Sequence, residues 1–334
     1  MAYGVRDLRK IELGKETTAG TAVAATTVWG GTGVLKDDRE ITVVEEDVGY
    51  LQPLGRQYVP RYGATIDFDE IEATFEQLPY LLAASVENVT TGAADGDGSG
   101  KIYQYDFATN AANTITTYTI EAGDNQRVDE MEYSFVEEWT LSGAKNEAVK
   151  MQGSWRGRQA TDTEFTGALS RPTVEEILFN KGKLYIDATG GTIGSTQKTA
   201  TWLGFTLHGV PGQKAHYTGD GNLYYTDVKQ VTGELTGELV LEHDATGEAE
   251  LGFARTGVVR LARMQFQGSA LTTAGTTYTY KTLQINLAIK YTDVPELGED
   301  EGDNTLTLPF RAIYSTADSQ SNQVIVVNEL ASLP

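Results

Sequence analysis

The chain has 334 residues, and 40% of them are hydrophobic, which suffices for a buried core and argues against wholesale disorder. Its 26 basic and 47 acidic residues give a net charge of −21, which repels phosphates and disfavours a protein that reads DNA or RNA. Cysteine is absent, which excludes disulfides, thiolate metal sites and cysteine nucleophiles.

The residue types favour β structure arranged in two domains. Glycine occurs 36 times and tyrosine 17 times, and threonine recurs along the whole chain. Thr, Val, Ile and Tyr suit half-buried strands, and glycine suits the turns between them. Because a domain usually holds about 100–200 residues, we expect two packed domains, mainly β, built as antiparallel sandwiches or barrels and each flanked by a short helix.

Residues 1–40 are predicted to form an extended N-terminal arm that leads into the first strand. After Ile11 and Leu13, residues 14–33 are rich in glycine, threonine and alanine and hold too few large apolar groups to bury themselves. Trp29 and the valines near it are nevertheless apolar enough to dock on another surface. We therefore expect the arm to lie on a neighbouring subunit, with a flexible terminus as the alternative.

Residues 41–165 are predicted to form the first β domain. In the segment 62–72, Ala64, Ile66 and Phe68 alternate with polar residues, which is the period of a half-exposed strand. Further strand signals occupy residues 41–48, 102–109, 113–123, 131–143 and 148–158, and the last two are joined by a hairpin turn at 143–146.

One helix is expected in this first domain. A helix that began near Phe75 would be kinked by Pro79, whereas a start near Leu78 makes Pro79 the first helical residue and avoids the conflict. Thr74 and Gln77 have the spacing of a capping box, which favours the earlier start. We prefer the start at Leu78.

Residues 166–334 are predicted to form the second β domain, because the chain is polar and irregular over 158–171. A short helix is expected over 172–180, where Pro172 comes early and Ile177 lies on the apolar side. Strand signals then follow at 183–189, 199–209, 222–230, 233–244, 258–268, 276–294, 305–315 and 323–330.

A weak internal repeat accompanies the two-domain prediction. Residues 138–143 and residues 204–209 each place an aromatic–Thr–Leu strand before a closing glycine. Six matching positions are weak evidence for duplication, because any two β-rich segments can match this well.

The residues that usually carry catalysis are scarce. The three histidines, His208, His216 and His243, show no metal-binding spacing, and there is no GxSxG elbow, P-loop or dinucleotide-binding glycine motif. A triad assembled in space stays open as an alternative. We predict no catalytic and no cofactor-binding residue, no cofactor, and a protein that is not an enzyme.

One loop has the spacing of a calcium site. Asp95, Asp97, Ser99 and Asp106 stand at positions one, three, five and twelve, with Gly100 at position six, as in an EF-hand loop. The last ligand is Asp rather than a bidentate Glu, and a strand rather than a helix is expected to follow. A plain turn uses the same residue types, so no metal ligand is assigned.

Two other groups of residues allow a functional interpretation. The acidic run 296–304 is a candidate metal site, but a solvated hairpin loop explains it better. Trp202, Tyr224 and Tyr225 are able to line a glycosidase cleft beside two carboxylates. We expect these aromatic residues instead to be strand residues that face a core or a neighbouring molecule.

Several segments resemble the major tail tube proteins of siphophages. The N-terminal stretch 11–33, IELGKETTAGTAVAATTVWGGTG, resembles the start of those proteins. Residues 73–82, ATFEQLPYLL, are similar to their strand-to-helix segment. Residues 184–196 and the strands around Phe205 and Phe266 fit the family in style.

The resemblance implies a structural virion protein of the viral tail, assembled in the host cytoplasm. In that family a β-sandwich beside a helix joins its sheet to those of neighbouring copies, and the rings stack around a channel. Two tube-type domains in one chain imply rings of three copies with pseudo-sixfold symmetry, or rings of six. The implied partners are further copies, the tape-measure, tail terminator and baseplate proteins, and viral DNA that passes an acidic channel without specific binding.

Membrane association is not expected. The first residues lack the apolar core of a signal peptide, and no window approaches the roughly 18 apolar residues of a membrane span. Three alternatives to a tail tube protein remain: a capsid decoration or cement protein, a carbohydrate-binding sandwich and, last, a glycosidase or metal-dependent hydrolase. The acidic excess also suits mere solubility or a salt-rich habitat.

Overall fold

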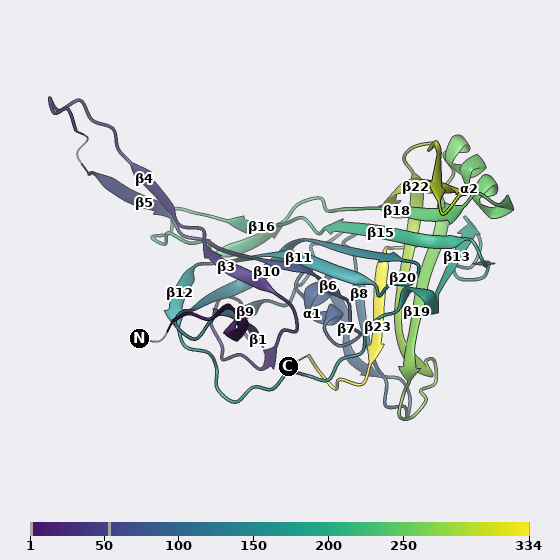
Figure 1. Cartoon of the computed structure of the whole chain (residues 1–334), viewed down its shortest axis with the longest axis horizontal. Helices are drawn as coiled ribbons and strands as arrows, with labels where there is room; N and C mark the ends of the chain where they lie inside the picture. The colour runs from purple at the N-terminus through teal and green to yellow at the C-terminus, as the bar shows by residue number, and fades with distance from the viewer. Residues whose placement is uncertain (1–2, 53–54, 334) are drawn as a thin grey trace.

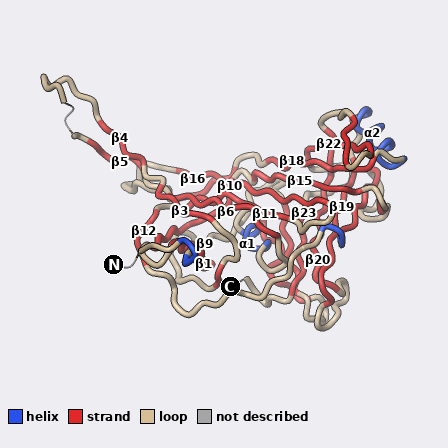
Figure 2. The backbone as a smooth tube through the Cα atoms, viewed as in Figure 1, coloured by secondary structure: helices blue, strands red, loops and turns tan. Residues whose placement is uncertain are grey.

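The computed structural model describes residues 3–52 and 55–333 of the chain. Strands make up 50% of it and helices 7%, and every strand pairing is antiparallel, so the prediction of a mainly antiparallel β protein is confirmed. The molecule is elongated, with a thin hairpin projecting from one end and a helix at the other (Figures 1 and 2).

The first half of the chain builds two sheets that share one long strand. Its strands are β1 (Lys10–Lys15), β2 (Thr27–Val28), β3 (Gly33–Asp37), β6 (Ala64–Glu72), β9 (Tyr118–Gly123), β10 (Val128–Ala144), β11 (Lys150–Gly157) and β12 (Ala160–Thr163). One sheet has the order β3–β6–β11–β10 and the other the order β1–β9–β10–β12. The short strand β2 pairs with β1.

The second half builds two sheets in the same way. Its strands are β13 (Gly182–Ala188), β14 (Gln197–Lys198), β15 (Trp202–Val210), β18 (Glu234–Glu242), β19 (Arg260–Ala270), β20 (Tyr280–Tyr291), β21 (Leu297–Asp300), β22 (Asp303–Ile313) and β23 (Gln323–Asn328). The sheet orders are β15–β18–β22–β21 and β13–β19–β20–β23. The end of β20 also pairs with β22, which joins the two sheets, and the short strand β14 pairs with β13.

The two halves therefore repeat one topology. Each has a helix after the second strand of the larger sheet, α1 (Leu78–Ala83) after β6 and α2 (Ala245–Thr256) after β18. Each also has a hairpin before that strand: β4 (Glu40–Val43) with β5 (Gln57–Arg61), and β16 (Gln213–His216) with β17 (Asp227–Gln230). Among the described residues, the hairpin of β7 (Glu87–Ala94) and β8 (Lys101–Asp106) has no counterpart in the second half.

The halves are joined by strand pairing as well as by a shared core. Strand β10 pairs with β15, which makes one continuous sheet of the two larger sheets, and β8 pairs with β23. One contiguous hydrophobic cluster draws side chains from both halves. The predicted boundary between residues 165 and 166 lies in the connection between β12 and β13, and the existence of two separate folding units stays a prediction.

The six-residue repeat expected from the sequence does not mark equivalent positions. Residues 139–144 of β10 pair antiparallel with residues 204–209 of β15, with Leu141 opposite Leu207. In the repeated topology β10 corresponds to β20 and β21, and β15 corresponds to β3. The two matching segments are thus neighbours across the junction between the halves, and they owe their similarity to a shared environment.

One predicted helix is confirmed and the other is wrong. Helix α1 begins at Leu78 with Pro79 in its first turn, and the backbone N–H of Gln77 donates to Thr74 Oγ1 at 3.1 Å. Residues 172–180 contain no α-helix, because Ile177 is extended and donates to Ala73 O at 2.9 Å. That segment ends in a single 3₁₀ turn (Phe179–Lys181), matching another at the N-terminus (Arg6–Leu8).

The prediction of an extended N-terminal arm over residues 1–40 is wrong for the described residues 10–29. Strand β1 pairs with β9 along its whole length, and Ile11, Leu13 and Trp29 are buried in the core of their own chain. A Cβ at Gly14 would lie 2.5 Å from Ala24 O, so glycine lets the following segment fold back closely over β1. The small residues of this segment permit close packing rather than an extended course.

Candidate assembly surface

The continuous sheet exposes one polar face. In β6, β11, β15 and β18, core side chains alternate with exposed ones, so each strand presents every second residue to the outside. Helix α1 packs on the inner face, where a Cβ at Gly153 would lie 2.4 Å from Leu81 Cδ1. We use the name polar face for a central set of these outward residues, together with those of β10: Thr65, Asp67, Glu138, Thr140, Ser142, Ser154, Arg156, Thr206, His208, Thr236 and Glu238.

Hydroxyl groups and a small excess of acid characterise the polar face. Its three carboxylates, those of Asp67, Glu138 and Glu238, outnumber the one guanidinium, that of Arg156. Burial opposes the charge of Arg156, but its Nε donates to Glu137 Oε1 at 2.6 Å, and the pKa of Arg156 lies above its usual value. The charge of Arg156 is therefore already neutralised by a neighbour.

Strand β3 is one free edge of this sheet. Within residues 3–52 and 55–333 it pairs with β6 alone. Asp69 donates its N–H to Thr32 O at 3.0 Å and Asp38 donates to Gly63 O at 2.9 Å, so the even-numbered residues between them direct their backbone groups toward β6. The backbone N–H and C=O of Leu35 therefore point away from the sheet, where another strand is able to pair with them.

Strand β21 is the other free edge. It pairs with β22 through a two-residue turn in which Glu301 and Gly302 have φ values of 53° and 94°, and no other pairing of β21 exists among the described strands. This confirms that the acidic run 296–304 forms a hairpin. Leu297 on β21 is 54% exposed, whereas Leu141 on the corresponding strand β10 is fully buried.

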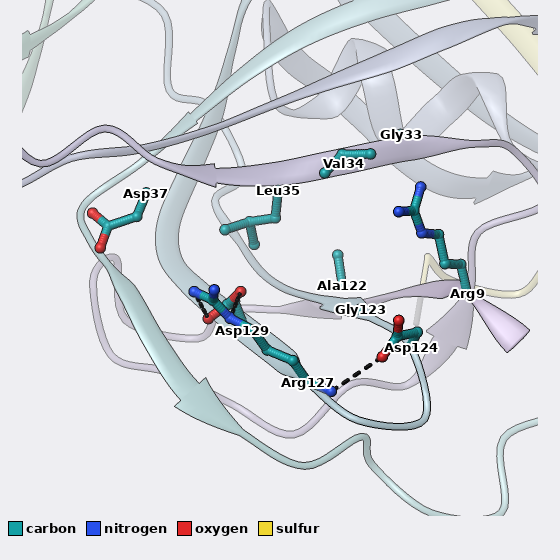
Figure 3. Close-up of a pocket in the computed structure, with 10 residues that line it drawn as sticks. All are labelled: Arg9, Gly33, Val34, Leu35, Asp37, Ala122, Gly123, Asp124, Arg127 and Asp129. Atoms are coloured by element: carbon teal, nitrogen blue, oxygen red, sulfur yellow. Dashed lines mark hydrogen bonds and ion pairs between the residues drawn. The ribbon is translucent and has the colours of Figure 1, made fainter. Parts of the chain in front are cut away.

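A groove of about 320 Å³ lies beside the β3 edge (Figure 3). It separates β3 from β9, and Leu35 and Ala122 lie on its two sides. Arg127 on its floor binds Asp129, with its Nε 2.8 Å from Asp129 Oδ2. The groove gives an incoming strand space next to the unpaired backbone of β3.

The hairpin of β4 and β5 projects from the body of the molecule (Figure 1). Both strands pair only with each other among the described residues. We call this hairpin the apolar arm, and its exposed large side chains are Ile41, Val43, Val48, Tyr50, Leu51 and Tyr58. An exposed apolar surface of this kind usually marks an interaction site.

The equivalent hairpin of β16 and β17 instead folds back on the body. Tyr225 is fully buried and donates its hydroxyl to Tyr133 O at 2.7 Å. Tyr217 donates to Tyr62 O at 3.0 Å, and Tyr62 N donates to Leu223 O at 2.8 Å, at the base of the apolar arm. Of the two topologically equivalent hairpins, β16–β17 therefore packs on the body and β4–β5 projects from it.

The three histidines do not form a common site. His208 lies on the polar face with Nδ1 3.1 Å from Thr140 Oγ1. His216 lies on β16, where its Nε2 is 3.1 Å from Lys229 Nζ, and His243 lies beside α2. Their separate places on three elements provide no basis for a catalytic constellation.

The calcium-type loop is closed by protein groups. The carboxylate of Asp95 accepts N–H groups of Thr277 at 2.9 Å and Tyr278 at 2.7 Å. Although burial favours the neutral acid, these donors hold the pKa of Asp95 below its usual value. Asp106 ends β8, six residues beyond the loop at about 3.3 Å per residue, so the proposed ligands do not converge.

The candidate sugar-binding aromatic residues belong to two separate clusters. Trp202 packs with Phe179 and Phe266, at centroid distances of 4.7 Å and 5.5 Å. Tyr225 packs with Tyr133 at 5.3 Å, on a different part of the chain. They do not line a common cleft, and no group of three metal-ligating side chains occurs among the described residues.

The sequence did not predict the two free sheet edges or the projecting hairpin. Residues 41–48 were predicted as a strand, but nothing in that segment distinguishes a projecting arm from a core strand. No protein-family profile and no curated protein sequence matches the chain. In the part that the structure describes, no helix is both long and apolar enough to cross a bilayer.

Proposed function

We propose that the chain is the major tail tube subunit of a long-tailed virus, and that three copies close a ring. The observation that carries this proposal is the repeated four-strand sheet. The two repeats pair with each other through β10 and β15, and their other edge strands, β3 and β21, have no further strand beside them in the described part of the chain. The resemblance in sequence to siphophage tail tube proteins supports the same function. The virion tail, assembled in the host cytoplasm, is the proposed location.

The internal junction between β10 and β15 is the template for the contact between copies. There the last strand of the first repeat pairs antiparallel with the first strand of the second repeat. In the same sense, β21 of one copy pairs with β3 of the next. Because strand direction alternates along the sheet, β21 of one copy is antiparallel to β3 of the next. The contact is heterologous, and a heterologous contact closes into a ring when its rotation permits.

The size of such a ring suits the passage of DNA. One chain contributes eight strands to the continuous sheet: β3, β6, β11, β10, β15, β18, β22 and β21. Three copies make a barrel of 24 strands. With strands about 4.8 Å apart and tilted by about 40°, the backbone diameter is roughly 50 Å. That leaves room for a duplex inside the side chains, whereas six copies double the diameter.

In this ring the polar face lines the lumen. Its serine and threonine hydroxyls are neutral, and its small acidic excess repels phosphates, so DNA slides past without specific binding. The apolar arm reaches the adjacent ring and buries its exposed side chains there. The tape-measure, tail terminator and baseplate proteins are proposed as further partners, through the same family resemblance.

Electron microscopy of the purified protein at high concentration tests the proposal, together with mass photometry. We expect rings with a mass of three chains, and tubes at the highest concentrations. A stable monomer under all conditions contradicts the proposal. Compact trimers that bind only capsids would indicate a decoration protein instead, and binding of glycans by the monomer would indicate a carbohydrate-binding module.

A further inference from the structure

Three glutamates form a row across the smaller sheet of the first half. Glu12 on β1 lies opposite Glu121 on β9, and Glu121 lies opposite Glu130 on β10. Glu12 and Glu121 are 0% and 3% exposed. Directly opposite residues have their Cβ atoms about 4.5–5.5 Å apart, and like charges at such positions destabilise a sheet. The proposed ring makes no use of this row.

The two buried carboxyl groups have unequal hydrogen-bond partners. Glu121 accepts from the N–H and the hydroxyl of Thr166, each at 2.6 Å, so both of its oxygens have donors. Glu12 Oε1 accepts from Lys10 Nζ at 2.5 Å. Glu12 Oε2 is buried and has no hydrogen-bond partner among the described residues. A buried carboxyl oxygen without a protein donor favours the neutral form of its group, because burial of an ionised oxygen is costly unless a donor compensates it.

We propose that Glu12 and Glu121 share one proton, which Glu12 Oε2 carries and donates to the carboxylate of Glu121. The proton comes from solvent, and the pair then holds one negative charge. This carboxyl pair fastens β1, and with it the N-terminal segment, to β9. The inference does not rest on the proposed ring, because it concerns contacts within one chain.

The pKa directions around the pair agree with a shared proton. Burial raises the pKa of Glu12, Lys10 opposes the rise, and the Glu121 carboxylate adds to it. Burial, followed by the charges of Glu121, Glu132 and Glu16, raises the pKa of Glu130. The charged groups near the pair are Lys10 of β1, Glu16 directly after β1, Glu130 and Glu132 of β10, and Arg158 after β11. Acids outnumber bases, so the surroundings favour retention of a proton.

The pair makes the attachment of β1 dependent on pH. Because the folded-state pKa of Glu12 is raised, its contribution to stability is complete below the usual value of 4.5 and is lost as pH rises through the raised value. Above that pH both groups are ionised and repel each other across β1 and β9. Arg9, which precedes β1, lines the groove beside the β3 edge, so a loosened β1 also alters that groove.

Hydrogen exchange measured by mass spectrometry on the peptide covering residues 10–28 tests the proposal. The matched variant is Glu12→Gln, whose amide donates to Glu121 without a titratable proton and still accepts from Lys10. We expect equal exchange rates in the two proteins near about pH 5, and exchange at least tenfold faster in the wild type near about pH 9. Glu248→Gln on the exposed face of α2 is the control and leaves the exchange of this peptide unchanged.

Two outcomes overturn the proposal. One is a ratio of exchange rates that does not change with pH. The other is faster exchange in Glu12→Gln at every pH, which means that the native carboxyl is ionised. A carbon-13 NMR titration of the Glu12 carboxyl decides independently of any substitution: the proposal requires a pKa above the usual value, and a pKa at or below it contradicts the shared proton.

Discussion

The β10–β15 junction and the free edges β21 and β3 occupy corresponding places in the repeated sheet. At the junction Leu141 pairs with Leu207, and both are 0% exposed. On β21, the counterpart of β10, Leu297 is 54% exposed. The same sheet position is thus covered by a neighbouring strand at β10 and, among the described strands, left uncovered at β21. The difference teaches that a single copy completes only half of the junctions that its sheet can make, so the remaining half is available to another copy.

The largest expected effect is a difference in the free energy of unfolding between substitutions at Leu141 and at Leu297. Leu141→Ala leaves a cavity at the filled junction and lowers the free energy of unfolding of the monomer by about 2–5 kcal/mol. Leu297→Ala changes it by less than about 0.5 kcal/mol, because the side chain is exposed. Urea unfolding followed by tryptophan fluorescence measures both. Equal losses in the two variants would mean that the free edge is already covered within the monomer.

The next effect concerns assembly rather than stability. Leu35→Pro removes an N–H that points away from the sheet, so the monomer folds and the number of rings falls at least tenfold. Lys36→Pro is the matched control, because its N–H points toward β6 and the loss of that ladder hydrogen bond costs about 1–3 kcal/mol. Mass photometry reports the rings and circular dichroism the fold. Normal rings in folded Leu35→Pro would remove β3 from the contact.

The two equivalent hairpins allow a sharper comparison. Replacing Tyr50 and Leu51 of the apolar arm by serine leaves rings intact but reduces their stacking into tubes at least tenfold, because the buried apolar contact between rings is lost. Leu223→Ser on the folded-back hairpin is the control and leaves tube length unchanged. Negative-stain microscopy measures tube length. Full-length tubes formed by the arm variant would place the contact between rings elsewhere.

The smallest effect is that of salt. A net charge of −21 on each chain makes neighbouring copies repel one another. Raising the salt concentration from about 0.1 M to about 1 M shortens the Debye length from about 10 Å to about 3 Å and should lengthen the tubes severalfold. Light scattering during a salt titration follows this. Dissociation of tubes at high salt would show that ion pairs, rather than apolar contacts, hold the rings together.

The sequence predicted local structure wherever the pattern was strong. The alternation of Ala64, Ile66 and Phe68 gave β6, and Pro79 placed the start of α1 correctly. Helix α2 was missed because four of its twelve residues are glycine or threonine, which leaves a weak apolar face. Its ends did carry signals: Asp244 caps the N-terminus by accepting from Thr246 and Gly247, and Gly257 ends it with a φ of 66°.

Long-range features were beyond reach of sequence patterns for physical reasons. The apolar residues next to Ile177 in the sequence are spaced as in a helix, but backbone hydrogen bonds to Ala73 and Val149 hold Ile177 extended. The repeat preserves the order of strands rather than their residues, so only the pairings reveal it. The same holds for the Glu12–Glu121 pair, since residues more than a hundred positions apart become opposite only through the sheet.

Disulfide cross-linking tests the account most directly, because the chain has no cysteine and any bond must come from introduced residues. Leu35→Cys on β3 is combined in turn with Leu297→Cys and Glu299→Cys on β21, and Leu35→Cys with Val258→Cys is the control. The account predicts covalent products of two and three chains after oxidation, from the β3–β21 pairs only. Monomers alone, under conditions in which the wild type forms rings, would contradict it.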